Sequence, residues 1–294
     1  MTMCPLAFAG EATHTEPQTL PADRQHTPWW LHFHLWGLDA PLAALAWALV
    51  YVRQLDILST PGEPIFLLCV AVWAFNILGH LIALIVYREN PARCWKPDFY
   101  RAHLVPLSLL LLSALLSALW LALYQVGVYY LSFAAIPAAF WLLAVALPAM
   151  WRKTAVQALL LAWAFALSCS APAWFYSIAG SPRDMLFFAP TLAFMVLIFL
   201  FNLGRKCWLN REEDDRDNMQ ILLPVGLFLL LIFCMVSAPF REPAERSFYY
   251  AVAMGAALLQ VMDRLSSCLS RDVMLASGWL LVAVPGFFAY FLLL

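Results

Sequence analysis

Charge is scarce in this sequence. Only 12% of the 294 residues are Asp, Glu, Lys or Arg, whereas a soluble domain carries about 25%. Hydrophobic residues make up 64% of the chain and the mean hydropathy is +0.78. These values exclude a soluble globular domain and predict a polytopic membrane protein. The net charge of −1 does not identify a partner, because in a membrane protein the distribution of charges among the loops matters more than their sum. A nucleic-acid partner is not expected.

Several enzyme motifs and cysteine patterns are also missing. The sequence contains no GxSxG, P-loop, GxGxxG or HExxH motif, so hydrolase, NTPase and zinc-protease functions have no support. Its seven cysteines are an odd number without CxxC spacing, which predicts neither a disulfide framework nor a zinc site. The polar segment up to Thr27 lacks the basic and apolar regions of a signal peptide. We therefore expect a disordered tail over residues 1–30 and one transmembrane domain over 31–294.

Long apolar segments fill the rest of the chain. A bilayer-spanning helix needs about 20 mostly apolar residues. The predicted fold class is all-α, a polytopic membrane bundle of about nine transmembrane helices. The predicted spans are 36–52, 65–87, 104–124, 128–150, 155–175, 186–203, 221–238, 248–262 and 273–294. The eighth is the weakest prediction because it is short and contains Gln260.

The basic residues orient these spans. With the N-terminus in the cytoplasm, 13 of the 17 Lys and Arg residues lie on the cytoplasmic side and four outside, as the positive-inside rule requires. The C-terminus is then outside. The polar loops after the second and sixth spans share the cytoplasmic face.

Three short pieces carry a family resemblance. They are "LDAPL" at Leu38–Leu42, "WAFNILGHLIA" at Trp73–Ala83 and "KPDFYRAH" at Lys96–His103, about a tenth of the chain. Together with nine spans, they resemble the UbiA-type intramembrane prenyltransferases, in particular an uncharacterised bacterial branch. The resemblance implies a UbiA-like fold in a bacterial inner membrane. It also implies transfer of a prenyl group from a prenyl diphosphate to a small acceptor. Asp-rich motifs after helices two and six of that family hold Mg²⁺, which neutralises the diphosphate.

The second predicted span departs from this pattern. Gly79, His80 and Ala83 stand where the pattern has Asp, Arg and Asp, and neither Gly nor Ala can bind Mg²⁺. Asn76 and His80 share one helix face and are the candidate catalytic residues. Histidine is a poor Mg²⁺ ligand, but it can donate to a phosphate or carry a proton near neutral pH. Alternatively, His80 hydrogen-bonds a carbonyl of a neighbouring helix.

The run "NREEDDRDN" at 210–218 lies where the second metal motif belongs. Glu213 and Asp217 are four residues apart, a version of the family's D-x-x-x-D spacing. The candidate Mg²⁺ ligands are Glu213, Asp214 and Asp217. The candidate substrate-binding residues are Lys96, Arg101, Asn202 and Arg205. The alternative for the acidic run is a solvated loop with weak surface ion pairs, and for Arg101 an interfacial anchor.

Several further polar and aromatic residues have predicted structural roles. Asp39, before Pro41, is predicted to cap the first span, and His32 to His34 to form an interfacial belt without a metal. Asp263 is expected to pair with Arg264 or with headgroups. Asn76 and Asn202 are expected to form interhelical hydrogen bonds, and Asn202 can also line a cavity. Four deep tryptophans either line an isoprenoid-sized cavity or pack: Trp73, Trp120, Trp141 and Trp163.

Three functions compete at this point. The first is Mg²⁺-dependent prenyl transfer. The second is a catalytically inactive UbiA-like protein that binds a membrane lipid or isoprenoid, or acts as a membrane partner. A transporter is the least favoured because no matching pair of interrupted helices appears in the two halves.

Overall fold

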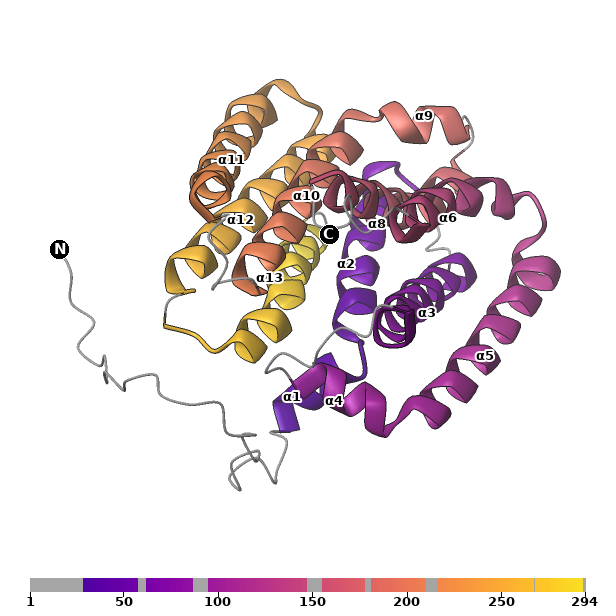
Figure 1. Ribbon diagram of the computed structural model, residues 1–294. Helices are drawn as coiled ribbons and strands as arrows, with labels where there is room; N and C mark the ends of the chain where they lie inside the picture. Colours follow the sequence, from indigo (N-terminus) through magenta and orange to yellow (C-terminus); the bar gives the residue numbers. More distant parts are fainter. Residues whose placement is uncertain are drawn as a thin grey trace, which may run out of the picture.

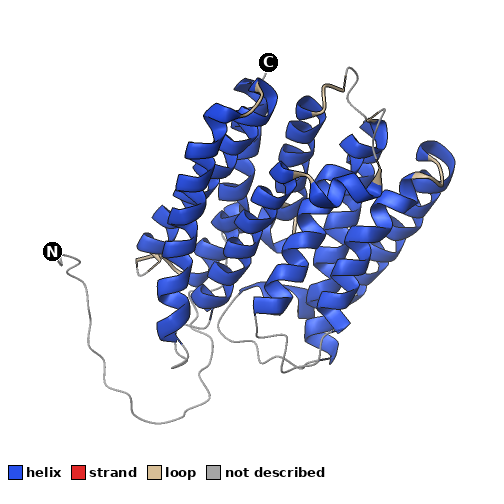
Figure 2. Ribbon diagram, turned by 90° about the horizontal axis from the view of Figure 1, so that it is seen from above, coloured by secondary structure: helices blue, strands red, loops and turns tan. Residues whose placement is uncertain are grey.

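The protein is helical throughout the part that the structure describes. The computed structural model describes residues 29–57, 62–86, 95–146, 155–177, 181–209, 216–266 and 268–292. No strand occurs in these ranges (Figure 2). The predicted all-α class is confirmed.

Nine helices of the described ranges coincide with the nine predicted spans. They are α2 (Asp39–Gln54), α3 (Gly62–Val86), α5 (Leu104–Leu121), α6 (Tyr130–Ala146), α8 (Ala155–Tyr176), α10 (Ala189–Leu209), α11 (Arg216–Ser237), α12 (Pro243–Leu265) and α13 (Arg271–Leu292). Shorter elements join or flank them: α1 (Trp29–Leu35), α4 (Trp95–Ala102), the π-helix η2 (Ala122–Val126), α9 (Pro182–Phe187) and the 3-10 helix η3 (Ala238–Phe240).

Six of these segments are long and apolar enough to cross a membrane: Gly62–Ile82, Leu104–Val126, Ala155–Tyr176, Ala189–Trp208, Leu222–Phe240 and Val273–Phe291. Helix α2 has 16 residues and α6 has 17, both short of a full span, and α12 carries charged residues at both ends. The protein is therefore a membrane-embedded helical bundle, and nine spans remain a prediction.

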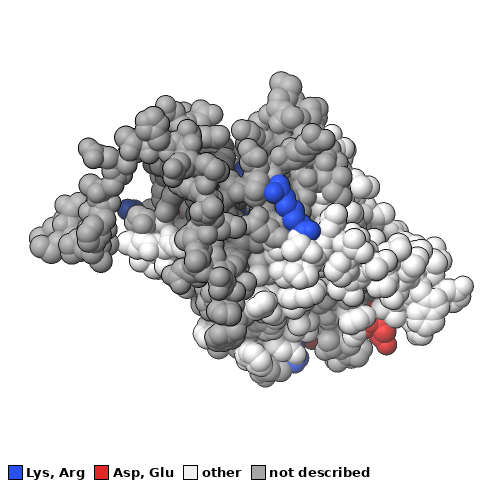
Figure 3. All heavy atoms as spheres, turned by 60° about the horizontal axis from the view of Figure 1, so that its bottom comes forward, with Lys and Arg blue, Asp and Glu red and all other residues white. Residues whose placement is uncertain are grey.

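The surface fits a lipid environment. Large apolar side chains point outward along α5 and α11, for example Val105, Leu116, Leu229 and Val236. A soluble protein rarely exposes such continuous apolar surface. Figure 3 turns the end of the bundle that carries α1 and α4 forward, and the described atoms there are mostly uncharged.

Successive long helices run in opposite directions. Four hydrogen bonds join helix ends on one side of the bundle: Asn76 to Gly37, Asn202 to Ala158, Trp208 to Asp263, and Ser277 to Met262. An alternating topology brings these pairs together, because it places the turn at Gly37, the start of α8 and the ends of α10 and α12 on one side. We call this side the α1 end, because α1 packs there against the start of α13.

Helix α2 lies in the middle of the bundle (Figure 1) and packs against α13, α3 and α8. Its many alanines allow close approach, and a Cβ on Gly286 of α13 would lie 3.0 Å from the Ala46 Cβ. The Trp47 ring stacks on Phe194 at 4.0 Å between centroids. The Trp47 Nε1 donates to the carbonyl of Val282 over 2.8 Å.

Helices α5 and α6 form a hairpin whose arms pack on different neighbours. The short connection between them is built by η2 and Gly127, which has φ +99°. Helix α5 packs mainly on α3, and α6 mainly on α8. Figure 1 shows the two arms diverging from the turn.

Candidate cavity with one polar end

A cavity of about 400 Å³ lies between the arms of this hairpin and the centre of the bundle. Helices α2, α3, α5, α6, α8, α10 and α13 contribute to its wall. Most lining side chains are alanine, leucine or aromatic. Its volume is within the range of about 300–1,000 Å³ that small-molecule sites occupy.

The cavity is elongated along α3. Leu67 lines it near the α5–α6 turn, where it clusters with Ala122 and Tyr130, and Asn76 lines it toward the α1 end. At 1.5 Å of rise per residue, Leu67 and Asn76 are about 13 Å apart along the helix axis. This shape suits a chain better than a compact molecule.

Its charged and amide side chains all lie toward the α1 end. Asn76, Asn202 and Arg205, each predicted as a site residue, line the cavity together. The Asn76 Nδ2 donates to the Gly37 carbonyl and the Asn202 Nδ2 to the Ala158 carbonyl, both over 3.4 Å. The predicted interhelical hydrogen bond is confirmed for Asn202, which also lines the cavity wall as predicted. Asn76 instead bonds the turn between α1 and α2.

The Arg205 guanidinium lies against two aromatic rings. Its Cζ is 5.7 Å from the Phe201 ring centroid and 5.9 Å from that of Trp279. Both distances allow a cation–π interaction. The Arg205 Nε is buried and has no hydrogen-bond partner within the described part of the chain. Trp279 also lines the cavity, and no sequence signal separated it from the other tryptophans.

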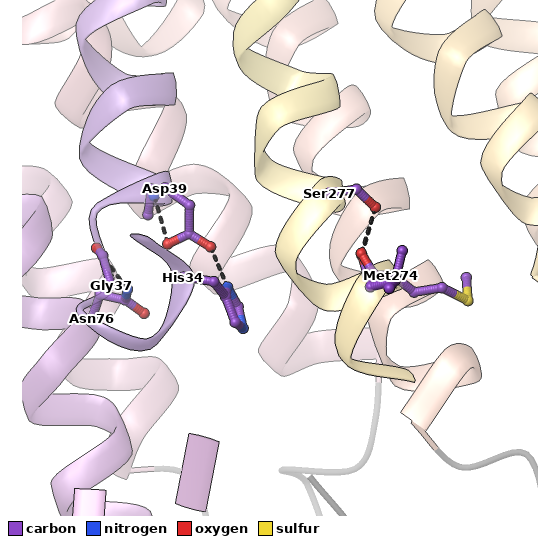
Figure 4. Close-up of polar contacts among 8 residues, drawn as sticks. His34, Gly37, Asp39, Asn76, Met274 and Ser277 are labelled. Atoms are coloured by element: carbon purple, nitrogen blue, oxygen red, sulfur yellow. Dashed lines mark hydrogen bonds and ion pairs between the residues drawn. The ribbon is translucent and has the colours of Figure 1, made fainter. Parts of the chain in front are cut away.

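A buried His–Asp pair stands beside this polar end (Figure 4). The His34 Nδ1 lies 2.6 Å from the Asp39 Oδ2, and the side chains are only 4% and 1% exposed. The Asp39 Oδ1 accepts from the Ala40 N–H over 3.0 Å. The predicted capping role is wrong, because Leu38 is the N-cap residue of α2 and has no side-chain cap bond.

The interfacial belt predicted for the two histidines is wrong for His34, and for His32 it stays a prediction. His32 is exposed on α1, whereas His34 is buried. The i to i+2 spacing places them on different sides of the helix, because residues two apart do not share a face. His34 therefore points to the start of α2.

Gly37 lies in the turn between α1 and α2. Its φ is +68°, a left-handed conformation that side chains other than hydrogen disfavour. A Cβ there would lie 3.0 Å from the Asn76 Nδ2 and 3.3 Å from the Ile77 Cδ1. Glycine thus allows both the turn and the contact with α3.

His80 and Arg101 are not among the residues that line the cavity. The His80 ring lies 5.3 Å from the Tyr100 ring centroid, and Arg101 is exposed on α4. Burial raises the pKa of the Tyr100 phenol above its ordinary value, and the negative charge of Asp39 raises it further. The second-span polar cluster is therefore split, with Asn76 in the cavity wall and His80 against α4.

The predicted metal ligands fall beyond what the structure describes. Glu213 and Asp214 lie outside the described residues, and Asp217 and Lys96 lie in α11 and α4 with side chains that are not described. In the described ranges, no group of three or more His, Cys, Asp or Glu residues is arranged to hold a metal ion.

The tryptophan and Asp263 predictions have mixed outcomes. Trp141 lines the cavity. Trp163 stacks on Phe140, Trp73 donates to the Trp36 carbonyl, and Trp120 is exposed. Asp263 accepts a hydrogen bond from the Trp208 Nε1 of α10 over 3.2 Å, and no ion pair joins it to Arg264 within the described residues.

No family model, no curated protein and no solved structure matches this chain. The apolar wall can hold a hydrocarbon chain. The α1 end can bind a polar group through one guanidinium and two amides.

Proposed function

We propose that this protein binds a single-chain membrane lipid, of isoprenoid size, inside the bundle. The observation that carries the proposal is the lining of the cavity. Its wall is apolar over about 13 Å, and its charged and amide groups, Asn76, Asn202 and Arg205, gather at one end. A hydrocarbon chain gains about 25 cal/mol for each Å² that it removes from water. In a bilayer that gain is small, so selectivity has to come from shape and from the polar end.

The α5–α6 hairpin offers a route from the bilayer. Its arms pack on different neighbours, and both contribute lining residues, Leu119 on α5 and Ala138 on α6 among them. The outer face of α5 carries exposed leucines. A lipid can therefore pass sideways between the arms without crossing the polar end.

Filling the cavity tests the proposal. Ala164 on α8 is buried and lines the cavity. The Ala164→Trp variant should lower the affinity for radiolabelled farnesol at least about tenfold, a difference of about 1.4 kcal/mol. The control is Val156→Trp, which adds the same ring at an exposed position of the same helix. Equal saturable binding by the two variants would contradict the proposal, provided that both remain monodisperse in detergent.

Mg²⁺-dependent prenyl transfer by a UbiA-like fold is the second candidate. One observation favours it: α10 carries Arg205 and ends at Leu209, so the acidic run follows directly from the helix that lines the polar end. Carboxylates there could hold Mg²⁺ for a diphosphate, as the resemblance implies. The metal and the acidic residues would supply what the described wall of the cavity lacks, a hard oxygen-ligand set.

This candidate has its own test. Farnesyl diphosphate is offered to the purified protein with Mg²⁺ and with chelator, beside the double variant Glu213→Ala/Asp217→Ala. The candidate requires binding that depends on Mg²⁺ and is lost in the double variant. The double variant Glu63→Ala/Glu242→Ala removes two exposed acids at the opposite end of the bundle and should retain it. Binding indifferent to Mg²⁺ and to both double changes leaves the acidic run as a solvated loop.

A further inference from the structure

The polar end of the cavity carries a positive charge, Arg205, that no carboxylate among the described residues contacts. No carboxylate in the described part of the chain lies within ion-pair distance of Arg205. Asp39 interacts with it electrostatically. However, the two Asp39 oxygens contact His34 and the Ala40 N–H. A charged side chain inside a membrane bundle needs a partner or a function.

The donors at this end outnumber the acceptors that contact them. A guanidinium carries five N–H donors and no acceptor, and the Arg205 Nε is buried without a partner among the described residues. The Asn76 and Asn202 amides each donate one N–H to a carbonyl and carry a second N–H. An unsatisfied buried donor is costly, so an acceptor-rich group is the natural complement.

Two aromatic rings contact this charge. Phe201 and Trp279 lie on the guanidinium at cation–π distances, and Trp279 and Arg205 both line the cavity. Aromatic faces hold the cation in place without accepting its strong hydrogen bonds. The Arg205 Nε–H, which no described residue accepts, therefore remains for a ligand.

We infer that the polar end is a metal-independent subsite for an anionic head, a carboxylate or a phosphate, at the end of the lipid chain. This inference rests on the proposed lipid-binding function and names the class of lipid. Guanidinium groups bind carboxylate and phosphate oxygens through paired N–H donors. The apolar wall then holds the chain.

The test compares probes with one chain and different heads. Farnesoic acid, farnesyl monophosphate, farnesol and methyl farnesoate are bound to the purified full chain in the presence of EDTA. Wild type should prefer the acid or the monophosphate over the two neutral probes by about tenfold or more, the usual effect of a charged hydrogen bond. A preference for the acid over the monophosphate, or the reverse, identifies which anion fits.

Arginine variants then assign the preference to the subsite. In Arg205→Gln the ratio of acid to methyl ester affinity should fall toward one. Arg53→Gln is the matched control, since Arg53 also lies over an aromatic ring, Tyr290 at 5.3 Å, and belongs to the opposite end of the bundle. The ratio should persist in this control. If Arg205→Gln does not fold, the ratio of acid to methyl ester affinity in wild type still tests whether the cavity prefers an anionic head.

Three results would overturn the inference: equal affinity for charged and neutral probes, a preference that Arg205→Gln leaves unchanged, or a preference that requires Mg²⁺. Failure of the underlying lipid-binding function has a different signature. In that case no probe binds saturably, or Ala164→Trp binds all of them as wild type does.

Discussion

The Nδ1 of His34 and the Oδ2 of Asp39 are 2.6 Å apart in the interior of the bundle, at the turn between α1 and α2. This pair joins α1 to the first residue of α2. Leu31 and Leu35 of α1 pack in turn on Ala276 of α13. The pair thus holds the end of the bundle beside the cavity together.

Breaking the pair should destabilise the protein strongly. His34→Ala or Asp39→Ala leaves one buried polar partner behind, and each should lower the free energy of unfolding by about 3 kcal/mol. The double variant should cost about as much as either single one, because the two side chains act as a unit. Unfolding in detergent measures this. His32→Ala, on the exposed side of α1, is the control, and additive losses in the double variant would show that the two groups do not interact.

Substituting Gly37 separates backbone strain from crowding. Gly127→Ala places a side chain at φ +99° in open space and should cost about 1–2 kcal/mol. Gly37→Ala adds a close approach to Asn76 at 3.0 Å and should cost more. Gly62→Ala meets nothing within 4 Å at a helix start and should be neutral or slightly stabilising. Equal melting temperatures for the Gly37 and Gly127 variants would mean that Asn76 moves freely.

Tyr100 should make the protein sensitive to alkali. Burial, and then the charge of Asp39, raise its folded-state pKa above the ordinary value of about 10. The folded state therefore holds this proton more tightly than the unfolded state. The resulting stability is complete below about pH 10 and falls as the pH rises further.

Thermal unfolding of wild type and Tyr100→Phe checks this sign. The stability of wild type relative to the variant should be constant below about pH 10 and fall as the pH rises toward about 11. Tyr124→Phe, at a position that is 75% exposed, should parallel wild type. A constant difference between wild type and Tyr100→Phe would contradict the assignment.

The Trp208–Asp263 hydrogen bond should contribute measurably to stability. Trp208→Phe keeps most of the buried ring but removes the Nε1 donor to Asp263. We expect a loss of about 1–3 kcal/mol, typical of a hydrogen bond to a charged group. Trp120→Phe, at an exposed position, should change the unfolding free energy by less than about 0.5 kcal/mol. If the Trp208→Phe variant is as stable as wild type, this hydrogen bond makes no net contribution to the free energy of unfolding.

The helices were predictable because hydropathy and length determine them directly. Each of the nine predicted apolar segments contains a helix. Asn76, Asn202 and Arg205 could be selected as candidate site residues from the sequence, because polar groups in apolar helices need partners. That they line one cavity depends on how α3, α8 and α10 pack, which spacing along one helix does not reveal.

The His34–Asp39 pair was missed for a local reason. Asp39 before a proline is typical of a helix start, and nothing in the letters shows that Gly37 adopts φ +68° and turns α1 back. Trp279 was missed because the chain has 13 tryptophans and only tertiary packing places this one beside Arg205. The contribution of Glu213, Asp214 and Asp217 stays a prediction.

If the protein binds a lipid as proposed, the one-ended polarity of the cavity has a consequence for where that lipid comes from. Arg205 and the two amides lie toward the α1 end, and the apolar cluster of Leu67, Ala122 and Tyr130 lines the other end. An amphiphile that enters between α5 and α6 can settle with its head in only one direction. The protein would then sample lipids from a single leaflet, and the sidedness of the bilayer itself would act as a filter on what it binds.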